Sequence, residues 1–126
     1  MNKLFLIAVA IACSGAVAQE KEIWACQQSA GTVMKYEQGE WEIYRKAPSN
    51  ILLTIDGPFS NIKIGDENRP ASCTNLWRER FSCVSVDTLD YITLDKATGK
   101  AGYSFLGGSM HNRDSISVGV YNCTKF

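Results

Sequence analysis

Short runs of alternating apolar and polar residues, separated by Gly, Asn, Asp and Pro, fill the chain from residue 22 onward. Such period-two alternation is typical of half-buried strands. No window of the sequence has the sustained apolar spacing of three and four residues that marks an amphipathic helix. The pattern therefore predicts an all-β fold, a small antiparallel meander of eight to nine short strands that forms a barrel or a sandwich.

Turn residues divide this pattern into segments. A hairpin is expected around Gln38-Gly39-Glu40, and a four-residue turn is expected at residues 96–99. The polar stretch at residues 66–72 is expected to be a connection. The strand-like segments lie at residues 22–28, 32–46, 50–56, 61–65, 73–77, 80–87, 90–95, 99–107 and 115–126.

Alternation also predicts which side chains form the core, because β-branched and aromatic residues at period two normally face a core. The expected core positions are Ile51, Leu53, Ile55, Ile62, Ile64, Ile92, Leu94, Ile116, Val118 and Val120, with Met34, Tyr36, Trp41 and Ile43 of the hairpin. The residues large enough to fill a barrel interior are Trp24, Trp41, Phe81, Tyr103 and Phe105.

Residues 1–18 have the three parts of a secretory signal peptide. Lys3 supplies a positive charge, residues 4–12 form a short apolar run, and Ala16-Val17-Ala18 is an A-x-A cleavage site followed by polar sequence. The apolar run is too short to span a bilayer, which takes about 20 residues. We expect cleavage after Ala18, export to the periplasm or secretion, and a single β domain at residues 19–126.

A second interpretation of this segment depends on Cys13. Bacterial lipoproteins are cut just before a cysteine that follows small and apolar residues. Ala10-Ile11-Ala12-Cys13 resembles that signal, with Ala where Leu is usual three positions before the cysteine. This interpretation implies a lipid anchor at Cys13. Both interpretations exclude Cys13 from the disulfides and leave four cysteines.

Four cysteines in a short exported chain predict two disulfides, for which three connectivities exist. In a hairpin centred on Arg78, Cys73 and Cys83 are each five residues from the centre and stand within bonding reach. Cys26, in the first strand, then pairs with Cys123, in the last. That second bond would join the two ends of the sheet.

Composition narrows the class of function. The 108 residues after Ala18 are enough for one domain. Their 12 basic and 13 acidic residues give a net charge of −1, without the basic excess that neutralises nucleic-acid phosphates. No apolar stretch of membrane-spanning length follows the signal. We therefore expect neither nucleic acid as a partner nor a membrane span.

The sequence has no recognisable catalytic or metal-binding arrangement, so we expect a non-enzymatic protein. Ser109, Asp114 and Ser115 flank His111, the sole histidine, but the segment lacks a nucleophile-elbow pattern. His111 is expected to be a solvated loop residue. One histidine, bridged cysteines and scattered carboxylates predict no metal site and no cofactor.

Two segments have the composition of a binding surface. Trp77, Arg78 and Arg80 gather around a hairpin tip, and Trp and Arg are the types most enriched among interface anchors. In the alternative, Trp77 covers the barrel end and the arginines face solvent. The second segment is the connection at residues 106–115, because loops on a rigid frame commonly carry binding. Its candidate residues are Met110, His111 and Arg113.

These observations predict an exported binding module whose partner is another protein or an envelope component. Thr98-Gly99 with Tyr103, in a disulfide-bonded barrel of this size, is similar to the Ser-Gly-x-x-Tyr segment of small periplasmic lysozyme inhibitors, with a different spacing and no serine. This resemblance implies lysozyme inhibition as an alternative. A small-ligand carrier would need an interior cavity of at least about 300 Å³. A hydrolase would need His111 or a carboxylate pair in a cleft.

Overall fold

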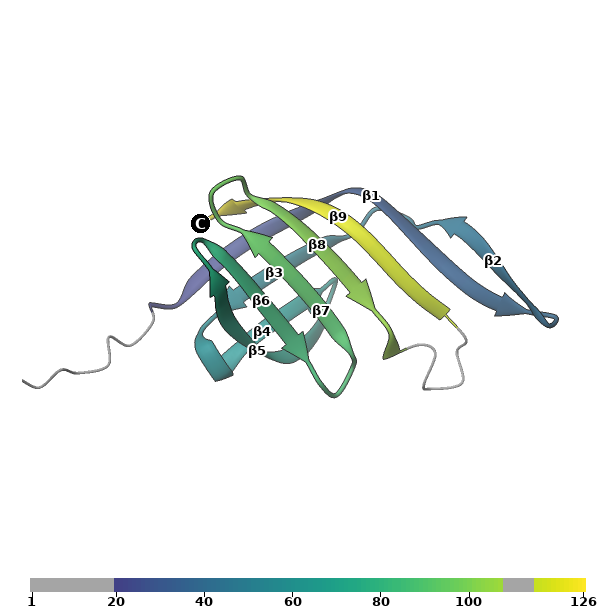
Figure 1. Cartoon of the computed structure of the whole chain (residues 1–126), viewed down its shortest axis with the longest axis horizontal. Helices are drawn as coiled ribbons and strands as arrows, with labels where there is room; N and C mark the ends of the chain where they lie inside the picture. Colours follow the sequence, from purple (N-terminus) through teal and green to yellow (C-terminus); the bar gives the residue numbers. More distant parts are fainter. Residues whose placement is uncertain (1–19, 108–114) are drawn as a thin grey trace, which may run out of the picture.

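The computed structural model describes residues 20–107 and 115–126 (Figure 1). Nine antiparallel strands form one sheet, in which neighbouring strands pair from β3 to β9 and β9 pairs back with β1. The strands are β1 (Glu22–Glu37), β2 (Glu40–Arg45), β3 (Asn50–Ile55), β4 (Ser60–Ile64), β5 (Glu67–Trp77), β6 (Arg80–Ser85), β7 (Asp90–Asp95), β8 (Lys100–Phe105) and β9 (Ser115–Lys125). The prediction of a small antiparallel all-β fold is confirmed, as an eight-stranded closed barrel with β2 outside it.

Strand β1 is long enough to serve two parts of the molecule. Residues 22–27 pair with β3, and residues 32–37 pair with β2 along the same edge. β9 covers the other edge. The far half of β1 therefore leaves the barrel together with β2 and the start of β9 (Figure 1). We call this projection the arm, defined as residues 30–37, 40–45 and 115–120.

A bulge in β1 reverses the faces of the strand. The sequence predicts two strands here, with a break after residue 28, whereas the structure has one strand with an irregular register between Gln28 and Ala30. Gln28 pairs with Tyr121, whose side chain is buried in the barrel, but Ala30 pairs with the exposed Val120. An extra residue in one strand shifts the alternation by one, so even-numbered residues of β1 face inward before the bulge and outward after it.

The core of the barrel is formed by sixteen buried apolar residues from seven of the eight barrel strands or more. The predicted positions Ile51, Leu53, Ile55, Ile62, Ile92 and Leu94 are all buried, as are Trp24, Phe81 and Tyr103. Ile64 and Phe105 are partly buried and pack against this core. These core predictions are confirmed.

The predicted inward face of β9 is wrong. Val118 and Val120 are 42% and 54% exposed, and Ile116 is half-buried, whereas Ser117, Gly119 and Tyr121 occupy the inner face. Gly119 is needed beside the Tyr121 ring, because a Cβ on Gly119 would lie 2.9 Å from a ring carbon. The small residues of β9 therefore make room for an inward tyrosine.

The predicted burial of the hairpin residues is also wrong. Tyr36, Trp41 and Ile43 are 43%, 52% and 73% exposed, and Met34 is half-buried. They lie on the arm, where β2 pairs with the projecting half of β1 and is not a strand of the barrel. The turn itself is as predicted, and Gln38 and Gly39 both have the positive φ that a tight hairpin turn requires.

The polar stretch 66–72, predicted to be a connection, instead forms the first half of β5. Glu67, Arg69 and Ala71 pair with Ile64, Ile62 and Ser60 of β4. The stretch lacks an apolar alternation because Arg69 takes an inward position, where it meets a carboxylate from β7.

Both predicted disulfides are present. Cys26–Cys123 joins β1 to β9 across the pairing that closes the barrel, and Cys73–Cys83 joins β5 to β6. In each pair the two cysteines stand directly opposite in the register, with Cα atoms 3.9 and 4.0 Å apart. Two intramolecular disulfides indicate an oxidising compartment, either the periplasm or the extracellular space.

Candidate functional site

One face of the arm carries a cluster of apolar side chains that are exposed or half-buried. Directly opposed residues of paired strands share a face. The register places Met34 opposite both Ile43 and Ile116, and Tyr36 opposite Trp41. The Tyr36 and Trp41 rings pack 5.3 Å apart. We call this cluster the outer arm face; its members are Met34, Tyr36, Trp41, Ile43, Ile116, Val118 and Val120.

The opposite face of the arm is polar and charged. Lys35 stands opposite Glu42, and its Nζ lies 5.5 Å from the centre of the Tyr44 ring. The Tyr44 hydroxyl donates to the carboxylates of Glu42 and, at 3.3 Å, Glu37. The hydrogen bond to Glu42 is the main cause that raises the pKa of Tyr44 to about 12. The arm is therefore amphipathic, with a hydrated side and an apolar side.

Side chains at the base of the arm tie the link between β2 and β3 to the barrel. Lys46 Nζ donates to the Tyr121 hydroxyl at 3.3 Å, and Ser49 Oγ lies 2.7 Å from the same hydroxyl. Gln28 Oε1 accepts from Ser49 Oγ at 3.1 Å. The backbone N–H of Lys46 donates to the carbonyl of Gly31 at 3.0 Å. These contacts link the base of the arm to the barrel wall.

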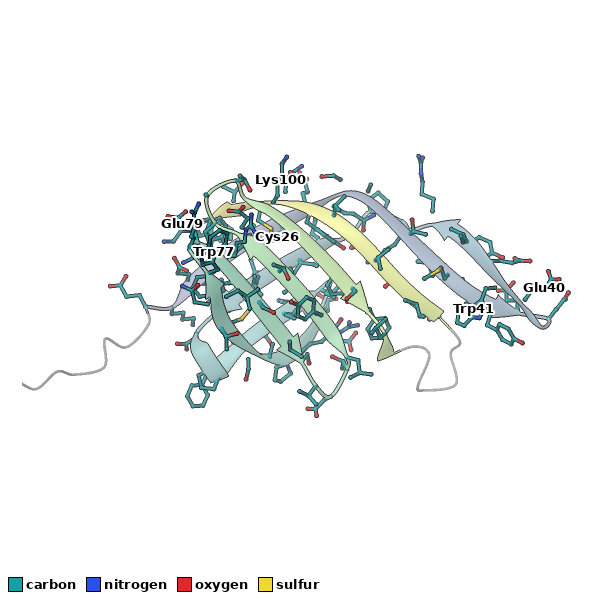
Figure 2. All side chains as sticks on the ribbon, viewed as in Figure 1. Cys26, Glu40, Trp41, Trp77, Glu79 and Lys100 are labelled. Atoms are coloured by element: carbon teal, nitrogen blue, oxygen red, sulfur yellow. A yellow bond between two sulfur atoms is a disulfide. The ribbon has the colours of Figure 1, made fainter. Side chains whose placement is uncertain are left out.

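The tip of the β5–β6 hairpin brings three of the predicted site residues together. Trp77 is 59% exposed, and the guanidinium carbons of Arg78 and Arg80 lie 4.3 and 5.8 Å from the centre of its ring. Arg80 also lies 3.7 Å from a carboxylate oxygen of Asp95. Trp77 and the arm residue Trp41 lie at opposite ends of the molecule (Figure 2).

The other predicted binding residues, Met110, His111 and Arg113, lie outside the described residues, as do Ser109 and Asp114. In the part of the chain that the structure describes, no three His, Cys, Asp or Glu side chains are grouped to hold a metal ion. No helix among those residues has the length and apolar character needed to cross a membrane.

A buried ion pair closes the other end of the barrel interior. Asp90 has no exposed surface and accepts from Arg69 Nη1 at 2.5 Å and from the hydroxyls of Tyr103 and Thr88. Arg69 Nη2 bonds to Glu67 at 3.0 Å. Burial, followed by the bond to Asp90, raises the pKa of Tyr103 above its ordinary value. Asp90 is paired with an arginine and not with a second carboxylate, so this cluster has the character of a structural ion pair.

Large side chains occupy the barrel interior, and the largest hollow on the described surface lies on its outer wall. This hollow of about 830 Å³ is lined by outward residues of four strands, among them Ala25, Gln27, Leu52 and Lys63. The segment similar to lysozyme inhibitors is not displayed, because Tyr103 is 4% exposed and Gly99 is buried against the Cys123 backbone. Neither alternative gains support from these positions.

The fold and its surfaces define a disulfide-bonded antiparallel β-barrel with a projecting amphipathic arm. Comparison of the chain with protein-family models, curated proteins and solved structures gives no match. The function therefore has to be inferred from the surfaces themselves.

Proposed function

We propose that this chain is an exported protein-binding module and that the outer arm face is its main contact surface. The observation that supports this proposal is the gathering of exposed aromatic and aliphatic side chains on one side of the arm, which is charged on its other side. Contiguous exposed apolar patches with polar surroundings mark interaction sites in monomeric proteins. Trp41 and Tyr36 are of the residue types that most often anchor such contacts.

Substitution of the outer arm face tests this proposal. Trp41→Thr with Ile43→Thr keeps residues that suit strands and removes two exposed apolar side chains. In capture experiments from periplasmic extract, we expect the variant to bind the partner held by the wild type at least tenfold more weakly, the effect of a modest hot spot. The thermal midpoint should change little, because both side chains are exposed.

The hairpin tip is a second candidate surface, favoured by the two guanidinium groups that flank the exposed Trp77 ring. Arg78→Ala with Arg80→Ala is therefore the matched variant for the capture experiment. Loss of the partner by this variant, with full capture by the arm variant, would assign the site to the tip and contradict the arm proposal. Met110, His111 and Arg113 stay a sequence-based prediction.

We also propose that residues 1–18 are removed on export. The mature protein should then begin at Gln19, and its intact mass should equal that of residues 19–126 less the four hydrogens lost to two disulfides. Mass spectrometry of exported protein checks this. A diacylglyceryl group on Cys13 would contradict it and support the lipoprotein interpretation.

A further inference from the structure

The outer edge of β2 is open. One edge of β2 pairs with residues 32–37 of β1, and within the described chain no strand pairs with the other edge. All six residues of β2 are exposed. An edge strand presents unpaired N–H and C=O groups, which readily accept another strand. Figure 1 shows β2 at the end of the molecule away from the β5–β6 hairpin, so a strand added there avoids that hairpin.

We propose that two copies of this chain pair antiparallel along β2, about a two-fold axis through Ile43. Ile43 then faces Ile43 of the second copy. On the same face, Trp41 lies opposite Arg45 of the second copy. On the other face, Glu42 lies opposite Tyr44 and Glu40 opposite Lys46. Because the contact is isologous, each unlike pair forms twice.

Charge and aromatic complementarity support this register. A guanidinium beside an indole ring gains a cation–π contact, and opposite charges on facing strands attract. Arg45 has no carboxylate opposite it within its own arm, because its partner on β1 is Thr32. A second copy would supply Trp41 at that position, and would bring Lys46 toward Glu40.

Neighbouring registers fit less well. A shift by one residue would place the apolar face of one arm on the charged side of the other, because side chains alternate. A two-fold axis at Glu42 would oppose two carboxylates, which is unfavourable. An axis at Tyr44 would leave Trp41 opposite Ala47, beyond the end of β2. The Ile43 register alone of these uses the whole strand and keeps like charges apart.

The pairing would join two arms into one sheet in which both outer arm faces lie on the same side. It does not depend on the proposed protein-binding function, because the edge of β2 and the outer arm face are different surfaces. A partner held on the face and a second copy held on the edge are compatible.

Sedimentation equilibrium of the mature, oxidised protein tests the pairing. We expect a reversible dimer whose dissociation constant rises at least tenfold in Arg45→Glu, because a carboxylate then faces the Trp41 ring. Lys100→Glu is the control, with the same change of charge on an exposed residue at the other end of the molecule (Figure 2). Circular dichroism verifies that both variants fold. A wild-type mass of one chain at concentrations up to about 1 mM would overturn the proposal.

Disulfide cross-linking tests the register independently. Directly opposed Cα atoms are about 4.5–5.5 Å apart, within reach of a disulfide, whereas diagonal positions are about 7–8 Å apart. Ile43→Cys should therefore give a covalent dimer under mild oxidation, and Glu42→Cys should give at least tenfold less. Equal cross-linking of the two variants would overturn the Ile43 register. Partner capture by monomeric Arg45→Glu at the wild-type level would show that the face binds without the pairing.

Discussion

Replacement of Cys26 and Cys123 by alanine is expected to lower the free energy of unfolding by about 5 kcal/mol, the chain-entropy value for a loop of this length. The two cysteines are 97 residues apart, so their bond restricts nearly the whole unfolded domain. The loss is comparable with the full stability of a small domain, about 5–15 kcal/mol. Urea unfolding of the oxidised mature protein and the variant measures the difference.

The Cys73–Cys83 bond provides the matched control. These cysteines are also directly opposed and buried, but only 10 residues separate them. Alanine at both positions is expected to cost roughly 3 kcal/mol by the same loop-entropy relation. Because the lost side-chain contacts are similar, the gap between the two variants reports loop length. Equal losses would show that packing or strain, and not chain entropy, sets the contribution of these bonds.

The strands and disulfides of the barrel were predictable because their signals are local. Turn residues delimit each strand, and the alternation of Ile51, Leu53 and Ile55 needs no knowledge of the partner strand. The Cys73–Cys83 pair follows from equal distances to a hairpin centre. Such signals survive in the tertiary structure because each barrel strand has one buried face.

The faces of the arm were not predictable by the same rule. Alternation shows that Met34 and Tyr36 share a face, but it does not say whether a core lies beneath that face. The bulge before Ala30 decides this, because it turns the even-numbered residues of β1 outward. Ser29-Ala30-Gly31 between two alternating runs was the available signal. The tip residues Trp77, Arg78 and Arg80 were found because a hairpin brings sequence neighbours together.

Long-range polar pairs lie beyond this kind of prediction. Arg69 lies in a stretch without apolar alternation, and its partner Asp90 is 21 residues further along the chain. Neither residue has a local pattern that identifies the other. Their burial is fixed by closure of the barrel, which brings β5 and β7 to either side of β6.

Removal of the Asp90 carboxylate is the second large effect that we expect. Asp90→Ala should lower the free energy of unfolding by about 3–5 kcal/mol, the usual cost of breaking a buried ion pair on one side. The Arg69 side chain, which is 13% exposed, would keep its charge without this carboxylate. The hydroxyls of Tyr103 and Thr88 would lose the same acceptor. Urea unfolding with an unchanged slope would show that stability alone has changed.

The double variant Arg69→Met with Asp90→Leu separates the cost of an unpaired charge from the value of the pair. Apolar residues of similar volume often replace a buried ion pair without loss, because two desolvation penalties disappear together. We therefore expect the double variant to recover most of the stability lost in Asp90→Ala. The coupling obtained from the full cycle with Arg69→Met should be at least about 2 kcal/mol, within the range for directly bonded residues. Additive losses would instead mean that Arg69 and Asp90 are each solvated in the folded protein, and that the inner end of the barrel is open to water.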